Sequence, residues 1–209
     1  MPGFNMALHN TAILQYIKST MFTICIAAAR SNSGKTTLAE RLLSRLDGWA
    51  ACKVTVCSPD GNHRCPRGND ACGVCTSLDE DYLLEETPAV IEEEGKDTWR
   101  YRQAGAAKVI WVKTKPDFLR TAVSEALEQL SDYPGVVVEG NHALAVIDPD
   151  VAAMVLSGRE GKQNYKPSAK AVLDKIDLTG EASDPALLER ILERVYTRQN
   201  GRKSPAGPA

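Results

Sequence analysis

The sequence predicts a three-layer α/β fold, in which a mostly parallel sheet is covered by helices on both faces. Segments that are apolar throughout alternate along the chain with amphipathic segments, and this alternation is typical of parallel strands buried on both sides. A short glycine-containing turn joins the first such pair. The 209 residues are enough for one domain of this kind with a full core and too few for two large ones.

The elements follow from hydrophobic periodicity. An apolar run at 22–29 predicts the first strand, and leucines spaced three and four residues apart predict a helix that Asp47-Gly48 closes. The last helix is expected to begin at Ser183-Asp184-Pro185, which combines a capping residue with an early proline. Another helix is expected over 119–130, and further strands at 53–57, 108–112, 135–140, within 152–156 and within 171–173.

The chain divides into three parts. Residues 1–20 are expected to be an N-terminal extension, since Met21 stands directly before the first strand. The folded domain is expected over 21–197, with a disordered tail at 198–209. Inside the domain, 57–95 is predicted to be a Cys-rich insertion whose acidic second half, 79–94, forms a solvated cover.

The overall charge excludes some classes of partner. The chain has 25 basic and 27 acidic side chains, a net charge of −2, so no general attraction to nucleic acid or to an anionic membrane is expected. No apolar stretch is long enough to span a bilayer, which predicts a soluble, cytoplasmic protein. An anionic ligand would therefore be held by a local site.

The turn after the first strand has the composition of a phosphate-binding loop. It begins at Ala29, where such loops normally have a glycine, and continues to Thr36. Backbone N–H groups over 32–37 are expected to surround a phosphate at the positive end of a helix. Lys35 would neutralise the β- and γ-phosphate oxygens, and the Thr36 hydroxyl would bind Mg²⁺. The predicted ligand-binding residues are Asn32, Ser33, Gly34, Lys35, Thr36 and Thr37.

A carboxylate is expected near this loop. Glu139 ends the apolar strand at 135–139, and parallel strands place their carboxyl ends on the edge of the sheet where ligands bind. Glu139 would hold a water of the Mg²⁺ shell or orient an attacking water. The alternative is a strand-ending glutamate that only caps the following turn.

The segment 172–178 resembles the base-recognition motif of P-loop GTPases, Asn-Lys-x-Asp, with Asp174 in place of the asparagine. Asp177 could accept hydrogen bonds from both N1–H and N2–H₂ of guanine, and Lys175 could cover the base with its aliphatic stem. Asp177 and Lys175 therefore favour GTP over ATP. Asp174 weakens this preference, because a carboxylate accepts only and cannot donate to guanine O6. The alternative is a charged strand end that binds no ligand.

The cysteine-rich segment offers five metal-ligand side chains, of which the last two have C-x-x-C spacing: Cys57, His63, Cys65, Cys72 and Cys75. Three or four of them could bind a tetrahedral Zn²⁺, and an iron–sulfur cluster is the second possibility. Free or redox-active thiols are the alternative without a metal.

These motifs together resemble the SIMIBI class of P-loop NTPases and, within it, the MobB family of molybdopterin-guanine dinucleotide biosynthesis. The resemblance rests on the phosphate loop, on Val138-Glu139-Gly140 and above all on the block Gly95–Ala106. It implies a P-loop NTPase fold, with Asp97 and Thr98 near the triphosphate and Mg²⁺. The stretch from 139 to 178 is also similar to related GTPases that deliver nickel to metalloenzymes.

The resulting predicted function is a GTP-binding, GTP-hydrolysing accessory protein of molybdenum cofactor biosynthesis, with Lys35, Thr36, Asp97 and Glu139 as its catalytic residues. Two alternatives remain: a GTP-dependent maturation factor for another metallocofactor, and a zinc-containing nucleotide-binding adaptor without significant hydrolysis. Arg30 and Arg100 are the only arginines expected near the loop, so turnover alone should be slow. A maturation enzyme or a second copy in a homodimer would complete the site.

Overall fold

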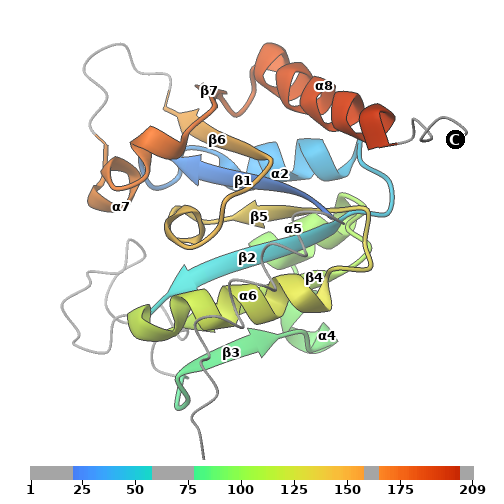
Figure 1. The fold of residues 1–209 in the computed structure, drawn as a ribbon. Helices are drawn as coiled ribbons and strands as arrows, with labels where there is room; N and C mark the ends of the chain where they lie inside the picture. Colours follow the sequence, from blue (N-terminus) through green and yellow to red (C-terminus); the bar gives the residue numbers. More distant parts are fainter. Residues whose placement is uncertain (1–20, 58–77, 158–164, 203–209) are drawn as a thin grey trace, which may run out of the picture.

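A computed structural model describes residues 21–57, 78–157 and 165–202. These residues form one seven-stranded sheet with the order β3-β4-β2-β5-β1-β6-β7, in which only the pairing of β3 with β4 is antiparallel (Figure 1). The strands are β1 (Phe22–Ala28), β2 (Ala50–Val56), β3 (Tyr82–Glu85), β4 (Val109–Thr114), β5 (Gly135–Glu139), β6 (Val151–Leu156) and β7 (Leu178–Glu181).

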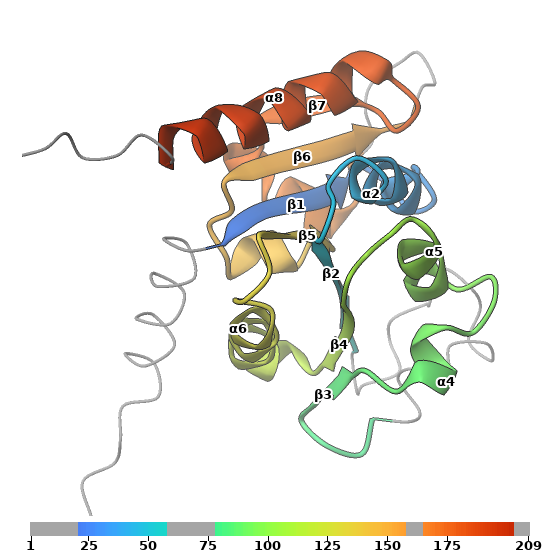
Figure 2. The ribbon, with the colours of Figure 1, turned by 90° about the vertical axis from the view of Figure 1, so that its right-hand side faces the viewer.

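Helices cover both faces of the sheet, so the predicted three-layer α/β fold is confirmed. Figure 2 shows α6 on one face and α2 with α5 on the other. The helices are α2 (Lys35–Leu43), α4 (Pro88–Ile91), α5 (Asp97–Gln103), α6 (Leu119–Gln129), α7 (Pro167–Lys170) and α8 (Pro185–Arg202), with 3₁₀ turns η1 (Pro116–Phe118), η2 (Ala143–Ala145) and η3 (Leu173–Lys175).

Each face has its own apolar core. Alternate β1 residues such as Ile24 and Ile26 pack with α2 and α8, whereas Cys25 and Ala27 pack with α6 on the other face. All seven residues of β1 are buried, which is why its sequence is apolar apart from Thr23. Among the described residues, no helix is both long and apolar enough to cross a membrane.

Three element predictions are wrong. The expected strand within 171–173 does not form: this segment runs from the end of α7 into η3, and the last strand is β7. The acidic stretch 79–94 is more than a solvated cover, because it contains β3 and α4. The tail does not begin at Arg198, since α8 continues to Arg202.

Contacts of Arg198 explain why α8 continues beyond the last apolar residue of its spacing pattern. Its guanidinium forms an ion pair with Asp150 and lies 5.5 Å from the ring centroid of Phe22. The Asp150 carboxylate also accepts a hydrogen bond of 2.7 Å from the backbone N–H of Thr23. These contacts attach the end of α8 to the edge where β1 and β6 begin. Residues 203–209 lie outside the described part of the chain.

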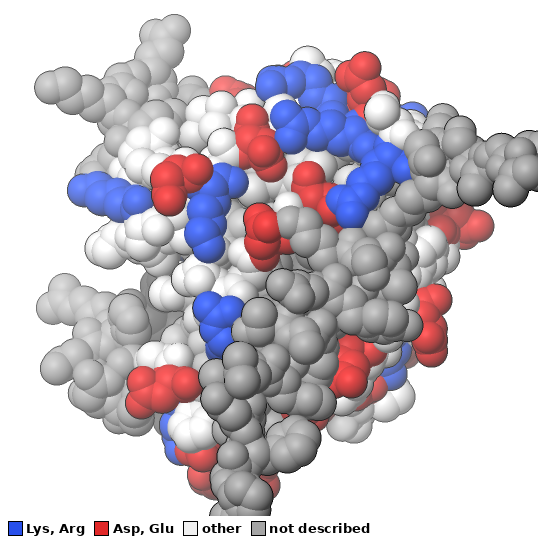
Figure 3. Space-filling model, in the orientation of Figure 1, with Lys and Arg blue, Asp and Glu red and all other residues white. Residues whose placement is uncertain are grey.

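Acidic and basic side chains are intermixed on the surface. Figure 3 shows both signs side by side over α8, without a broad field of one charge on this face. This distribution agrees with the small net charge of −2 and with binding of an anion, if any, at a local site.

Candidate functional site

The loop between β1 and α2 lies at the carboxyl edge of the parallel sheet. Ala29 follows the last residue of β1 and is still bonded to β6, because its N–H donates to Val155 O at 3.0 Å; its C=O accepts from Lys166 N at 2.9 Å. The backbone turns afterwards: Asn32 has φ 57° and Gly34 has φ 94°, both left-handed, and α2 begins at Lys35. Alanine is tolerated at 29 because the left-handed positions come later in the loop.

Gly34 is required for two separate reasons. Its φ of 94° is unfavourable for any residue with a Cβ, and a Cβ there would lie 2.6 Å from Cβ of Ala182. The loop is therefore packed tightly against the junction of β7 and α8.

We predict that Gly34→Ala lowers the free energy of unfolding by about 1–3 kcal/mol, because it combines left-handed strain with a steric clash. For a domain of this size the melting temperature should fall by about 3–10 °C in a thermal unfolding experiment. Gly95→Ala is the matched control, since Gly95 also has a positive φ, 82°, but no atom within 4 Å of the added Cβ. Equal losses in the two variants would show that the contact with Ala182 has no effect.

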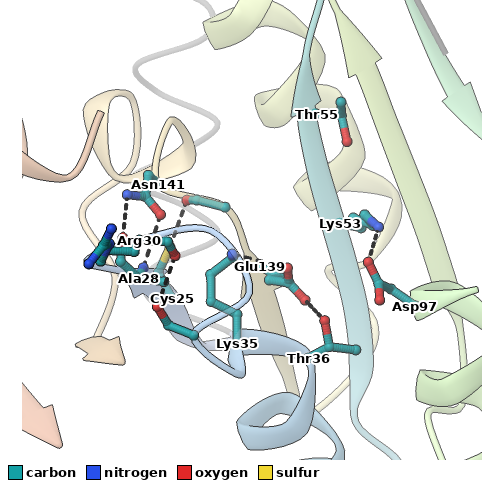
Figure 4. Close-up of polar contacts among 12 residues, drawn as sticks. Cys25, Ala28, Arg30, Lys35, Thr36, Lys53, Thr55, Asp97, Glu139 and Asn141 are labelled. Atoms are coloured by element: carbon teal, nitrogen blue, oxygen red, sulfur yellow. Dashed lines mark hydrogen bonds and ion pairs between the residues drawn. The ribbon is translucent and has the colours of Figure 1, made fainter. Parts of the chain in front are cut away.

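Lys35, Thr36 and Glu139 converge at the end of β5, as Figure 4 shows. The Thr36 hydroxyl donates to Glu139 Oε2 at 3.0 Å, and Lys35 Nζ lies 3.8 Å from Glu139 Oε1. The Lys35 and Glu139 side chains are 17% and 8% exposed, so their charges interact with little screening by solvent. The site thus contains one cation, one hydroxyl and one carboxylate within a few ångströms.

Tyr101 is a fourth member that sequence reasoning missed. It is 1% exposed on α5, and its hydroxyl donates to Glu139 Oε2. Burial, followed by the charge of Glu139 and the hydrogen bond to it, raises the pKa of Tyr101 well above its usual value. The phenol is therefore protonated at neutral pH and remains a donor to the carboxylate.

Helix α5 makes two further polar contacts around the loop. Asp97, its first residue, forms an ion pair with Lys53, which is the register partner of Glu139 on β2 (Figure 4). Arg100 binds both carboxylate oxygens of Glu40 on α2, at 2.7 and 2.5 Å. The block that was expected near the triphosphate therefore packs against both the loop helix and the strand beside Glu139.

Thr98 lies in the same helix and has an unusual environment. It is 1% exposed, and its hydroxyl oxygen has no hydrogen-bond partner among the described residues. A buried hydroxyl without a partner is unfavourable in most folds. The structure shows no contact between the Thr98 hydroxyl and the loop, so its place near the triphosphate stays a prediction.

A second cation, Lys166, lies close enough to interact electrostatically with Lys35 and Glu139. Lys166 lies beside the end of β1, because its backbone N–H donates to Ala29 O at 2.9 Å. Burial lowers the pKa of Lys166, the nearby Lys35 lowers it further, and Glu139 opposes both effects. No spacing pattern in the sequence indicates Lys166, which comes into the site only through the loop after β6.

Asn141 fixes the end of β5 to the end of β1. Its side-chain oxygen accepts from Ala28 N at 3.0 Å, and its side-chain nitrogen donates to Ala28 O at 2.9 Å (Figure 4). Gly140 before it has φ 152° and no room for a Cβ, since Val54 O would lie 2.9 Å away. Glu139 is thus held at the start of a backbone segment with few alternative conformations.

The structure corrects the predicted placement of Lys175 and Asp177. Asp177 stands before the start of β7, where its carboxylate accepts from Ala152 N at 2.7 Å and pairs with Arg194 at 3.3 Å. Lys175 Nζ donates to Leu144 O at 2.6 Å. Asp177 is engaged where β6 begins, at Ala152, whereas the loop lies where strands end. Leu144, which Lys175 contacts, belongs to η2 after the end of β5. We therefore do not expect Asp177 to contact a nucleotide base.

A cavity of about 700 Å³ lies beside the loop. It is lined by the loop itself (30–33 and Thr37), by Leu156 and Ser157 at the end of β6, and by residues 181–183 between β7 and α8. We call this space the loop cavity. Its size suits a small organic ligand that extends from the loop.

Of the five metal-ligand side chains predicted in the cysteine-rich segment, only Cys57 lies in the described part of the chain. It is 3% exposed, and its N–H donates to Thr114 O at 2.8 Å. His63, Cys65, Cys72 and Cys75 lie outside the described residues, so the metal site stays a prediction. Within the described residues, no three His, Cys, Asp or Glu side chains are grouped so as to hold a metal ion.

The remaining two cysteines, Cys25 and Cys52, are buried on the α6 face, as expected for small core residues. Burial raises the pKa of both thiols far above the usual value, to about 12 for Cys52. They are therefore neutral at physiological pH and not poised for nucleophilic chemistry.

No family model and no curated protein matches this sequence. Among solved structures, the fold is similar to that of HypB from Helicobacter pylori in complex with nickel, with a TM-score of 0.45 and 11% sequence identity. The similarity covers 96% of this chain and 100% of that one. At this level the likeness assigns neither an activity nor a ligand to this chain.

Proposed function

We propose that this protein binds a purine nucleoside triphosphate with Mg²⁺ at the β1–α2 loop and hydrolyses it. The observation that carries the proposal is the convergence of Lys35, Thr36 and Glu139, with the Thr36 hydroxyl 3.0 Å from the Glu139 carboxylate. Mg²⁺ prefers hard oxygen ligands, and it is usually held by one or two side chains together with phosphate oxygens and water. A hydroxyl and a carboxylate at this separation fit that requirement.

Each site residue then has a role. Lys35 compensates the charge of the β- and γ-phosphates, and Lys166, which interacts electrostatically with Lys35, adds a second positive charge. Thr36 binds Mg²⁺ directly, and Glu139 binds it through water or orients the attacking water. Asp97, paired with Lys53 one strand away, supports the Mg²⁺ shell on the side of α5.

Hydrolysis by the isolated chain should be slow. Stabilising the transition state of phosphoryl transfer commonly requires an arginine aimed at the γ-phosphate. Arg100 is held by Glu40 through two hydrogen bonds, so it would have to leave this carboxylate to reach a phosphate. We therefore propose that a maturation enzyme or a second copy of the chain accelerates turnover.

The cellular role that we propose is cytoplasmic maturation of a metal-containing cofactor. The Gly95–Ala106 block, which carries the resemblance to the MobB family, forms α5 beside the loop, and this placement supports a functional use of the block. Molybdenum cofactor biosynthesis and assembly of a different metallocofactor are both compatible with it. A metal bound by the cysteine-rich segment would favour the second. Elemental analysis of untagged protein tests for that metal.

The central experiment is a titration of the full chain with GTP and ATP, each with and without Mg²⁺, followed by a phosphate-release assay. Binding of a triphosphate that Mg²⁺ strengthens supports the proposal. Failure of both nucleotides to bind in the presence of Mg²⁺ would overturn it. Binding without phosphate release, alone or with a partner, would instead identify a nucleotide-binding adaptor.

We predict that Thr36→Val abolishes the effect of Mg²⁺ on nucleotide affinity, because it removes the hydroxyl ligand while nearly keeping the shape of the side chain. With Mg²⁺ present the affinity should fall about tenfold or more, as expected for losing one bond to a charged group. Without Mg²⁺ it should change little. Thr36→Ser keeps the hydroxyl and should restore the response, so a Mg²⁺ effect that survives in Thr36→Val would contradict the assignment.

A further inference from the structure

The loop cavity supplies an acidic group at the place where a nucleoside would extend from the phosphate loop. We propose that Glu181 recognises the Watson–Crick edge of a guanine base there, and that it takes the part the sequence suggested for Asp177. This inference rests on the proposed function and deepens it, since it names the base that the site selects.

The position of the cavity argues for a nucleoside. One wall is the loop itself, up to Thr37 on the first turn of α2, and the opposite walls are the ends of β6 and β7. With the terminal phosphates held at Lys35, the rest of a nucleotide must leave the loop along a neighbouring surface. The volume of about 700 Å³ leaves room for a ribose and a base.

The walls of the cavity are held in place relative to the loop. Arg41 on α2 donates to Ala182 O at 2.6 Å and to Asp184 O at 3.3 Å. Ala182 is also so close to Gly34 that no Cβ fits there. The segment that carries Glu181 is thus fixed to the helix that carries Lys35, as a site that discriminates between bases requires.

The chemistry of Glu181 favours guanine over adenine. An ionised carboxylate is an acceptor only, and it can accept from two adjacent donors at once. Guanine offers two such donors, N1–H and N2–H₂. Adenine offers N6–H₂ beside the acceptor N1, which would face a carboxylate oxygen without a proton between them. Leu156 at the end of β6 supplies an apolar surface for the face of the base.

Asp177, the earlier candidate, is excluded by topology. Ala153 on β6 pairs with Leu178, the first residue of β7, and on its other side with Ile26 on β1. Asp177, which precedes Leu178, therefore lies no nearer to the loop than the middle of β1. Glu181, three residues further along β7, pairs with Leu156 near the loop. Since β7 is a parallel strand, a carboxylate after its last residues reaches the ligand edge and one before its first residue does not.

The test measures affinities of the full chain for GDP, ADP and xanthosine diphosphate in the presence of Mg²⁺, in the native protein and in Glu181→Gln. The native chain should bind GDP at least about tenfold more tightly than ADP, a ratio within reach of a pair of charged hydrogen bonds. Glu181→Gln should lose most of that preference. It should also bind xanthosine diphosphate more tightly than the native chain does, because the glutamine amide can donate to the carbonyl that xanthine has in place of the guanine N2–H₂.

Two further variants make the result decisive. Glu189→Gln is the same chemical change on the exposed surface of α8, where Glu189 only pairs with Arg45, and it should leave all three affinities unchanged. Asp177→Asn should leave the ratio of GDP to ADP affinity unchanged. Loss of guanine preference in Asp177→Asn but not in Glu181→Gln would overturn the inference, as would equal native affinity for GDP and ADP. Failure of every nucleotide to bind would instead overturn the proposed function.

Discussion

A Lys35→Ala variant is expected to lose at least about a hundredfold in affinity for GTP with Mg²⁺, since charge-assisted hydrogen bonds in a partly buried site are about twice as strong as those between neutral groups. The Lys35 side chain is only 17% exposed and lies 3.8 Å from a single carboxylate. Its charge is therefore directed into the site. Isothermal titration calorimetry with the native and the variant chain measures the loss.

The fold should survive this substitution. Glu139 keeps its two hydroxyl donors, from Thr36 and Tyr101, when the ammonium is removed. Lys108→Ala is the matched control, because Lys108 pairs with Glu86 just before β4 begins, at the edge opposite to the loop. The control should bind nucleotide as the native chain does, and the melting temperatures of all three proteins should agree within a few degrees. Native affinity in Lys35→Ala would remove the phosphate loop from the proposal.

The parts of the fold that the sequence predicted well are those buried on both sides. β1 and β5 are apolar except for Thr23 and Glu139, because both faces of each strand pack against helices. α6 shows its spacing because one face alone is buried. β3 was missed because it is a four-residue edge strand among acidic residues, with no buried residue. β7 was missed because only Leu178 of its four residues is buried, so the nearby apolar Val172 gave the stronger signal.

The site could be predicted where a local motif or the geometry of a parallel sheet places its residues. Lys35 and Thr36 share one motif, and Glu139 was found because parallel strands bring their carboxyl ends together. Tyr101 and Lys166 carry no comparable signal, since only tertiary packing brings them to Glu139 and Ala29. The lookalike motif around Asp177 has suitable residues at the wrong end of a strand. The strand was expected before Asp177, within 171–173, and the observed strand β7 comes after it. With the strand misplaced, the sequence could not show that Asp177 stands at a strand's beginning and not at its end.

Tyr101→Phe should reduce nucleotide hydrolysis by about ten- to a hundredfold while changing GTP affinity by less than about threefold. The tyrosine hydroxyl donates to Glu139 Oε2, the same oxygen that accepts from Thr36, and phenylalanine removes that donor while keeping the ring. Without it the carboxylate can rotate away from Thr36, and small displacements of a group that orients water have large effects on turnover. Tyr101 therefore acts as a positioning residue for Glu139.

A double-mutant cycle separates this role from a general loss of stability. If Tyr101 acts through Glu139, Glu139→Gln alone should reduce turnover at least as much as Tyr101→Phe, and the double variant should be no slower than Glu139→Gln. Two effects that multiply would show that Tyr101 acts independently of the carboxylate. Tyr196→Phe, an exposed tyrosine on α8, is the control for removing a phenol and should hydrolyse GTP at the native rate. Because Tyr101 is 1% exposed, the melting temperature of the Tyr101→Phe protein must be recorded as well. A variant that unfolds several degrees earlier but keeps its turnover at 25 °C would assign the hydroxyl to stability alone.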